Sequence, residues 1–291
     1  MKRLLLIVLS TVTAVLADST INDTQKFAWA ANAGWVNLRP STANGLSVGE
    51  FVCAGYGYGA NFGWINFGSG APQNGIRYSN TNAVDVGVNL QPGGALRGQA
   101  WGANVGWIRF ETNGNPRVDY ATGRLLGYVW GANLGWINLN DLTYYVKTDV
   151  IQPGADSDND GITDAWERER ANSLTALNAI GDADGDGVSD RAEYFADTNP
   201  LDPADQFRIT GFQSDGDPAT QISLTWKSRP SRCYSIEARE SFDTAPDTGS
   251  WREVGIGALL GVEGGTQTQV LSGTVVTNPF YHLRVLLPLH P

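Results

Sequence analysis

A tryptophan-rich phrase occurs four times in the first half of the chain. It reads WAANAGW, YGANFGW, WGANVGW and WGANLGW, with its Asn at positions 32, 61, 104 and 133. The spacings between these Asn residues, 29, 43 and 29, are typical of a repeat fold built from small supersecondary units. The phrase constrains the fold strongly, because every copy must adopt the same local structure.

Each copy predicts a tight turn followed by a strand. Gly and Asn tolerate positive φ and favour a hairpin turn between the two aromatic residues. The residues that follow alternate, with Trp and then Asn or Arg on one face and aliphatic or Phe side chains on the other. Period-2 alternation in four copies indicates half-buried strands. The apolar positions are Val36, Leu38, Ile65, Phe67, Ile108, Phe110, Ile137 and Leu139.

The number of strands indicates that the repeat closes on itself. Each unit reads as three short strands, one of them near a Val-Asp pair such as Val84-Asp85 or Val118-Asp119. The first copy has no upstream strand, whereas residues 142–147 form a spare strand after the fourth. If the last strand completes the first unit, the sheet has no exposed edges. A closed barrel, a propeller-like ring and a short solenoid all satisfy this pattern.

The first 17 residues have the features of a cleavable export signal. Lys2 and Arg3 precede an apolar run of about a dozen residues, which ends in Val15-Leu16-Ala17. The run is shorter than the ~20 residues that a membrane span needs, and no later segment is long and apolar enough. We therefore expect a secreted or surface protein, extracellular or periplasmic, without a membrane span after cleavage.

Its two cysteines, Cys53 and Cys233, lie in strand-like runs, which favours unpaired thiols.

Negative charge is concentrated in one segment. The chain has a formal net charge of −10, and residues 152–205 alone contain eleven Asp, three Glu and three Arg. We therefore do not expect nucleic acid as a partner, since phosphate binding requires a basic surface. So dense an acidic block requires either solvation as a disordered linker or a bound cation.

Two loops within this segment have the ligand spacing of a calcium site. Both place carboxylates at positions 1, 3, 5, 9 and 12 and Gly at position 6. Ca²⁺ prefers six to eight oxygen ligands, and alternate residues of a curled loop can turn their carboxylates inward. The residue at position 7 would contribute its backbone carbonyl. The predicted ligands are Asp156, Asp158, Asp160, Ile162, Asp164 and Glu167 in the first loop, and Asp182, Asp184, Asp186, Val188, Asp190 and Glu193 in the second.

The apolar residue at position 7 distinguishes these loops from dockerin and EF-hand loops, which usually carry it at position 8. The pattern D-x-D-x-D-G-[IV]-x-D-x-x-E resembles bacterial thrombospondin type-3 repeats, as does the ending Glu193-Tyr194-Phe195 through Pro200. The tryptophan phrase likewise resembles G-Y-x-W-x-x-N-x-G-W-I repeats of exported bacterial proteins. The first resemblance implies calcium as cofactor and a secreted or surface location.

The last zone predicts further β structure. Ile222, Leu224 and Trp226 alternate with polar residues, and so do the apolar residues of 234–238 and 281–285. Short alternating strands over about 85 residues favour a β-sandwich of immunoglobulin or fibronectin-III type. The predicted organisation is a signal at 1–17, a β-repeat domain at 18–150, a calcium-binding segment at 152–205 and a sandwich at 206–291.

Three functions are compatible with this organisation. The repeat tryptophans Trp35, Trp64, Trp107 and Trp136 either pack between strands or form a glycan-binding face, and regular spacing favours packing. The predicted organisation is compatible with an adhesive or glycan-binding protein and also with a purely structural spacer. The alternative is a polysaccharide-active enzyme that uses facing carboxylates such as Asp85 and Asp119. Both Asp residues read more simply as turn residues, so we expect a non-enzymatic protein.

Overall fold

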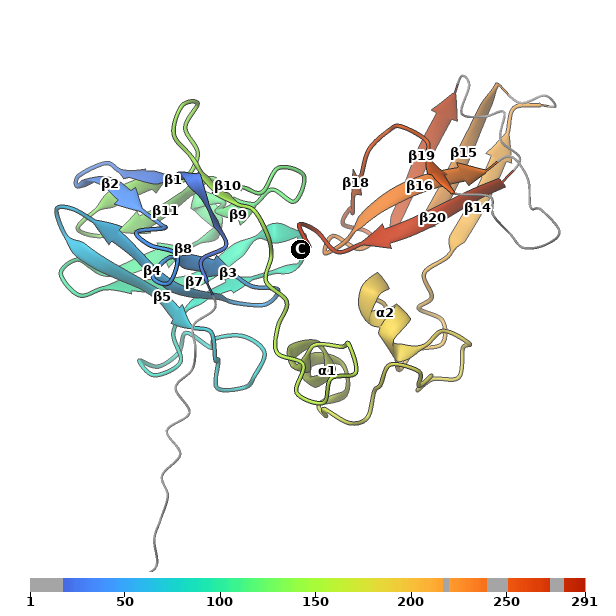
Figure 1. Ribbon diagram of the computed structural model, residues 1–291, viewed down its shortest axis with the longest axis horizontal. Helices are drawn as coiled ribbons and strands as arrows, with labels where there is room; N and C mark the ends of the chain where they lie inside the picture. The colour runs from blue at the N-terminus through green and yellow to red at the C-terminus, as the bar shows by residue number, and fades with distance from the viewer. Residues whose placement is uncertain (1–17, 217–219, 240–250, 273–279, 291) are drawn as a thin grey trace, which may run out of the picture.

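The structure, a computed structural model, describes residues 18–216, 220–239, 251–272 and 280–290. The predicted export signal at 1–17 lies outside the described residues. Figure 1 shows a β-barrel beside a pair of β-sheets, with two short helices between them. The prediction of a mainly β protein is confirmed, and the repeat forms a closed barrel.

Eight antiparallel strands form the barrel wall within residues 18–151. They pair in the order β1-β2-β4-β5-β7-β8-β11-β12, and β12 pairs back with β1. Each tryptophan phrase therefore forms one hairpin of the wall. The strands are β1 (Ile21–Ala30), β2 (Gly34–Asn37), β4 (Cys53–Gly59), β5 (Gly63–Ser69), β7 (Leu96–Gly102), β8 (Gly106–Phe110), β11 (Tyr128–Gly131) and β12 (Gly135–Asn138).

Five short strands extend the wall at one end of the barrel. They are β3 (Leu46–Val48), β6 (Val88–Leu90), β9 (Arg117–Val118), β10 (Arg124–Leu126) and β13 (Val146–Thr148). In the first unit β13 pairs with the start of β1, so that Thr148 lies opposite Ile21. The last strand thus completes the first unit, as the repeat pattern predicts.

The barrel interior is a packed hydrophobic core. All eight alternating apolar positions of the repeat are buried, with 5% of their surface or less exposed. Residues of the hairpin turns, among them Phe62, Val105 and Leu134, join the same core. Side chains fill the barrel and leave an apolar cavity of only about 20 Å³, so the interior has no room for a sugar ring.

The hairpin turns differ from the prediction in one detail. Positive φ occurs at the Gly that follows each motif Asn, for example +86° at Gly63 and +80° at Gly106, and not at the Asn. The Asn side chains instead join neighbouring turns. Asn61, Asn104 and Asn133 donate Nδ2–H to the carbonyls of Ala33, Phe62 and Val105, at 3.0, 3.1 and 3.1 Å. In these three units the motif Asn thus connects its turn to the turn before it.

The acidic segment carries both α-helices of the described residues. α1 (Asp164–Ala171) follows the first loop and α2 (Asp190–Ala196) follows the second. Ile162, Trp166, Leu177 and Tyr194 form a small core with Phe51 of the barrel. This segment is therefore packed against the barrel.

Two small antiparallel sheets make up the C-terminal part. One has the order β14-β15-β19 and the other joins β16 to β17, β18 and β20. Residues of both sheets share one core, including Trp226 and Tyr234. The strands are β14 (Ile209–Ser214), β15 (Gln221–Lys227), β16 (Cys233–Arg239), β17 (Arg252–Glu253), β18 (Leu259–Leu260), β19 (Thr266–Ser272) and β20 (Phe280–Leu286).

One strand departs from the predicted alternation. β15 alternates as expected, but all seven residues of β16 are buried. β16 is the central strand of its sheet, and its polar face is buried as well. Ser235 and Glu237 occupy that face, and His282 lies 3.3 Å from Glu237. The immunoglobulin or fibronectin-III type stays a prediction, because 240–250 and 273–279 lie outside the described residues.

The three parts meet at one junction. Arg232 of the C-terminal part donates to the carbonyls of Tyr194 and Phe195, at 2.6 and 2.7 Å, at the end of α2. The chain then returns to the barrel, where Leu289 packs against the barrel core and its carbonyl accepts from Ile151 N–H at 3.0 Å. In Figure 1 the C-terminus accordingly lies next to the barrel. Direct contacts therefore fix how the parts are placed.

Candidate metal centres and aromatic belt

The two acidic loops have the same backbone conformation. Positions 4 and 6 both adopt positive φ, with 61° at Asn159 and 87° at Gly161, and 77° at Gly185 and 92° at Gly187. Asn and Gly are the residues that adopt this conformation at least cost. The sequence identified the need for Gly at position 6, and the structure adds the same need at position 4.

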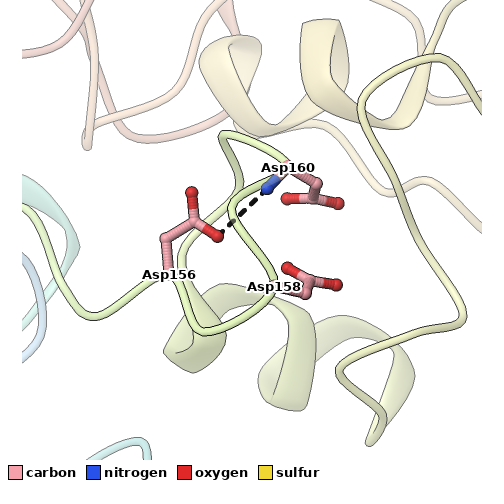
Figure 2. Close-up of side chains that lie close together, drawn as sticks. All are labelled: Asp156, Asp158 and Asp160. Carbon is pink, nitrogen blue, oxygen red and sulfur yellow. Dashed lines mark hydrogen bonds between the residues drawn. The ribbon is translucent and has the colours of Figure 1, made fainter.

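In the first loop the alternate aspartates gather around one space. Carboxylate oxygens of Asp156, Asp158 and Asp160 lie within 4.8 Å of one another (Figure 2). Asp156 accepts the N–H groups of Asp160 and Gly161, at 3.2 and 2.9 Å, which curls the chain around its carboxylate. The loop therefore holds three carboxylates close together at a cost in repulsion that a cation would remove.

The second loop repeats this arrangement. Oxygens of Asp182, Asp184 and Asp186 also lie within 4.8 Å of one another. Asp182 accepts the N–H groups of Asp186 and Gly187, at 3.1 and 2.9 Å. Two independent loops thus converge on the same geometry, as their matched spacing predicts.

Glu167 and Glu193, at position 12, stand in the first turns of α1 and α2 with 0% and 1% of their surface exposed. Several buried carboxylate oxygens here have no hydrogen-bond partner among the described residues. Buried charges of this kind require a counter-charge or a metal. The oxygens are both Oε atoms of Glu167, Oε2 of Glu193, and Oδ2 of Asp160, Asp184 and Asp186. The donor set therefore fits a hard cation such as Ca²⁺.

The electrostatics of the two Glu residues agree with this interpretation. Burial, together with the neighbouring Asp158 and Asp160 carboxylates, raises the pKa of Glu167 to about 7. Burial and the nearby Asp184 and Asp186 likewise raise the pKa of Glu193 to about 7, although Thr198 donates a hydrogen bond to it. A bound divalent cation would favour the charged form of both groups.

The aspartates at position 9 face the start of their own loop. Asp164 accepts Ser157 N–H at 2.7 Å and Ser157 Oγ–H at 2.6 Å. Asp190 accepts the N–H groups of Ala183 and Asn178, at 2.9 and 3.0 Å. In this structure they hold the loops closed, and the close clusters consist of positions 1, 3 and 5. Their role as direct ligands stays a prediction.

Of the two residues at position 7, Ile162 joins the small core shared with Phe51 of the barrel. Ile162 is fully buried and Val188 is half-buried. Each donates its N–H to the Asp at position 5, at 2.8 and 2.7 Å. The predicted contribution of their carbonyls to a metal site stays a prediction.

One barrel residue that the sequence did not indicate, Glu50, accepts hydrogen bonds from residues next to both loops. Glu50 Oε2 accepts from Thr163 Oγ1 at 3.0 Å and from the Tyr194 hydroxyl at 3.1 Å. Thr163 immediately precedes α1, and Tyr194 follows the predicted ligand Glu193. Burial raises the pKa of Glu50, while the Arg232 guanidinium opposes that shift. Glu50 belongs to no sequence motif and lies 113 residues before Thr163, so its role as acceptor is visible only in the folded structure.

A second candidate site is the outer surface of the barrel. All seven tryptophans of the repeat are 38 to 49% exposed, including the predicted Trp35, Trp64, Trp107 and Trp136. The expectation that regular spacing favours packing is therefore wrong for these rings, because the aliphatic face of each strand fills the interior. The rings meet as cross-strand pairs, with centroids 4.5 to 5.2 Å apart. The pairs are Trp29–Trp35, Tyr58–Trp64, Trp101–Trp107 and Trp130–Trp136. We call these four pairs the aromatic belt.

An N–H donor lies beside each pair of the aromatic belt. The donor is the residue that the adjoining strand places opposite one ring of the pair. These donor–ring pairs are Asn138–Trp29, Asn37–Tyr58, Asn66–Trp101 and Arg109–Trp130. Each of the three Asn residues accepts through Oδ1 the backbone N–H two residues further on, at 2.9 to 3.0 Å. This bond orients the amide and leaves its NH2 group as a donor. A groove between the third and fourth pairs is lined by Trp107, Trp130, Trp136 and Arg109, among others.

The carboxylates of the enzymatic alternative hold turns. Asp85 accepts the N–H groups of Gln73 and Ser79, at 3.1 and 2.9 Å, and these bonds lower its pKa. Asp119 accepts from Ala121 N–H and from Thr122 Oγ1, at 3.1 and 2.6 Å. Both carboxylates serve the local structure, as the simpler sequence interpretation expects.

The cysteines and the helices give two further observations. Cys53 and Cys233 are buried and unpaired within the described residues, as predicted, and burial raises the pKa of the Cys53 thiol to about 12. Among the described residues, no helix has the length and apolar character required to cross a bilayer.

Comparison with known proteins identifies the acidic segment. Residues 156–169 and 182–203 match the family model of the bacterial TSP3 repeat. No curated protein and no solved structure matches the chain. The segment is therefore a bacterial TSP3 repeat with two acidic clusters, consistent with binding of Ca²⁺. Repeats of this class are typical of extracellular and surface proteins.

Proposed function

We propose that the protein is an exported, calcium-ordered adhesive protein whose barrel binds glycans through the aromatic belt. The observation that carries the proposal is the fourfold presentation of an exposed aromatic pair beside an N–H donor, which a backbone hydrogen bond orients in three of the four units. The calcium segment connects this barrel to the C-terminal sheets.

The belt has the chemistry of a carbohydrate platform. A pyranose ring has an apolar face of C–H groups that packs on an aromatic ring, and its hydroxyls need hydrogen-bond partners at the edge. Cross-strand aromatic pairs also stabilise sheets by about 0.2–1 kcal/mol. Stabilisation of the sheet does not by itself explain why the rings are exposed in all four units. Contiguous exposed apolar surface is typical of interaction sites.

Calcium has a structural role in this proposal. The unpartnered oxygens at both loops make the metal-free segment electrostatically unfavourable, and binding would neutralise them. Glu50 and Arg232 then connect the ordered segment to the barrel and to the C-terminal sheets. Calcium thereby sets the placement of the belt relative to the remaining chain.

The other candidate functions receive less support. The hydrogen bonds of Asp85 and Asp119 favour a local role for both carboxylates over catalysis. A structural spacer that binds only calcium would account for the junction, but it gives no reason for the belt.

A polysaccharide panel tests the proposal. The full chain, in calcium, is incubated with soluble and insoluble polysaccharides, and bound protein and released reducing ends are both measured. We expect retention without reducing ends. The variant Trp107→Ala/Trp130→Ala removes two walls of the groove and should weaken retention about tenfold, since each aromatic contact contributes on the order of 0.5–1.5 kcal/mol.

The matched control is Phe212→Ala. Phe212 is an exposed ring, 55% accessible, on β14 and outside the belt. It should leave retention unchanged. Retention lost equally in both variants, or no retention on any polysaccharide, would contradict the proposal, and released reducing ends would favour the enzymatic alternative.

A further inference from the structure

We infer that the barrel carries four glycan-binding platforms facing different directions, so that one molecule cross-links neutral polysaccharide chains. This inference rests on the proposed glycan binding and adds its valency and ligand class. Each platform is one belt pair with the N–H donor on the adjoining strand.

The valency follows from the closure of the barrel. The four pairs lie on the four hairpins β1–β2, β4–β5, β7–β8 and β11–β12, and these hairpins together form the whole circumference. The outer surface of a closed barrel is convex, so a stiff polymer chain that contacts one hairpin leaves the opposite one free. Opposite pairs therefore take separate chains.

The register separates neighbouring platforms as well. Within a hairpin Trp101 lies opposite Trp107, but the next strand places Arg109, two residues further on, opposite Trp130. The other unit boundaries show the same step, with Asn37 opposite Tyr58 and Asn66 opposite Trp101. A donor thus stands beside each aromatic pair, so each unit repeats the same kind of site, and the groove lined by Trp107, Arg109 and Trp130 lies where two of these sites adjoin.

The charge distribution selects the ligand class. Residues 18–150 contain eight Lys or Arg and eight Asp or Glu, so the barrel has no net charge. Arg109 at the belt is paired with Glu111 at 3.4 Å. The three remaining platforms present Asn amides. This surface does not attract a polyanion electrostatically, and it matches a neutral polymer with flat sugar faces, such as a β-1,4-linked glucan.

The experiment measures stoichiometry and cross-linking on the full chain in calcium. Cellohexaose is titrated by calorimetry, and hydroxyethyl cellulose is mixed with the protein and followed by light scattering. We expect more than one hexaose per chain, up to four, and scattering that rises and then falls as protein exceeds polymer, as multivalent binding requires. Carboxymethyl cellulose should bind no better than the neutral polymer.

Two variants separate valency from binding. Trp101→Ala/Trp107→Ala should remove one site and retain cross-linking. Substituting three pairs and keeping Trp130 and Trp136 should retain hexaose binding and abolish cross-linking. The exposed positions leave the barrel core unchanged, and circular dichroism together with urea unfolding verifies the fold of each variant.

The outcomes are distinct. A stoichiometry of one without cross-linking, or loss of all binding in Trp101→Ala/Trp107→Ala, overturns the fourfold valency and leaves glycan binding intact. Cross-linking that persists with a single pair, or self-association without polymer, also overturns it. A preference for carboxymethyl cellulose overturns the neutral class. If neither cellohexaose nor any polysaccharide of the panel binds, the proposed function fails and the inference with it.

Discussion

At the scale of single residues, the most informative groups are two glutamates. Glu167 and Glu193 are buried in the first turns of α1 and α2, and their carboxylates have unpartnered oxygens within the described structure. A buried carboxylate of this kind destabilises the metal-free protein and serves the metal-bound one. Opposite effects with and without calcium therefore identify a ligand.

The first prediction concerns Glu167→Gln. Calorimetry should show calcium affinity at this loop falling by at least about tenfold, because a charged ligand is lost. In EGTA the variant should unfold at the same temperature as the wild type or a higher one, since a repulsive buried charge is removed. Glu169→Gln is the control, because Glu169 lies on the same helix but pairs with Arg77. Equal calcium affinity in all three proteins would exclude Glu167 as a ligand.

The second prediction is a pH dependence in the metal-free state. The folded-state pKa of about 7 exceeds the ordinary value of 4.5, so the folded protein binds protons more tightly than the unfolded chain. This contribution is fully present below pH 4.5 and is lost as the pH rises through 7. After calcium removal, Tm should be higher at about pH 5.5 than at about pH 7.5.

The same groups reverse the trend when calcium is present. Protons compete with the metal for the carboxylates, so Tm in calcium should be higher at the more alkaline pH. Glu167→Gln/Glu193→Gln should reduce both trends. A metal-free Tm that rises across this pH interval in the wild type would argue against the raised pKa values.

At the scale of elements, the repeat hairpin performs two tasks with one phrase. Its Gly provides the positive φ of the turn, while its Asn connects that turn to the preceding unit. The small residue before the turn leaves space for the apolar residue within the turn. A Cβ on Gly102 would lie 2.5 Å from Val105, whereas Ala30 in the first copy accompanies the smaller Ala33.

The third prediction tests the connection between turns. Asn104→Ala removes the donor to the Phe62 carbonyl and should lower the free energy of unfolding by about 1 kcal/mol. Urea denaturation measures this change. Asn113→Ala, at an exposed position of the same barrel, should have little effect. If the two variants unfold at the same urea concentration, the Asn bond contributes nothing.

At the scale of the whole molecule, calcium binding and assembly of the parts are coupled through few contacts. The residue before α1 and the residue after Glu193 both donate to Glu50. Asp197, at the end of α2, pairs with Arg170 at 2.7 Å and accepts from Ser231 of the C-terminal part. Loss of order in the loops should therefore reach the barrel and the sheets together.

The fourth prediction is that chelation exposes the segment 155–200 to protease. Trypsin has cleavage sites there at Arg168, Arg170 and Arg191, and we expect faster cleavage in EGTA than in calcium. Glu50→Ala should accelerate cleavage even in calcium, because it leaves two hydroxyls without their acceptor. Glu111→Ala, on the exposed barrel surface, is the control. Equal rates with calcium and with chelator would contradict calcium-dependent ordering.

Local periodicity determined much of this protein. The alternation after each tryptophan phrase placed the aliphatic residues and the tryptophans on opposite faces of a strand, and the count of strands indicated closure through the last strand. The Asp spacing located both acidic clusters, because ligands at alternate positions of one loop depend only on local backbone geometry. The alternation and the Asp spacing each span about a dozen residues along the chain, where sequence patterns are informative.

Tertiary structure decided the features that depend on distant residues. It chose a barrel over a ring or solenoid, since β12 pairs with β1 across more than 100 residues. It also selected Glu50 as the common acceptor of both loops and buried both faces of β16. The exposure of the tryptophans was decided in the same way. Alternation specifies two faces of a strand, but only closure of the barrel determines that the aliphatic face fills the interior and the tryptophan face meets solvent.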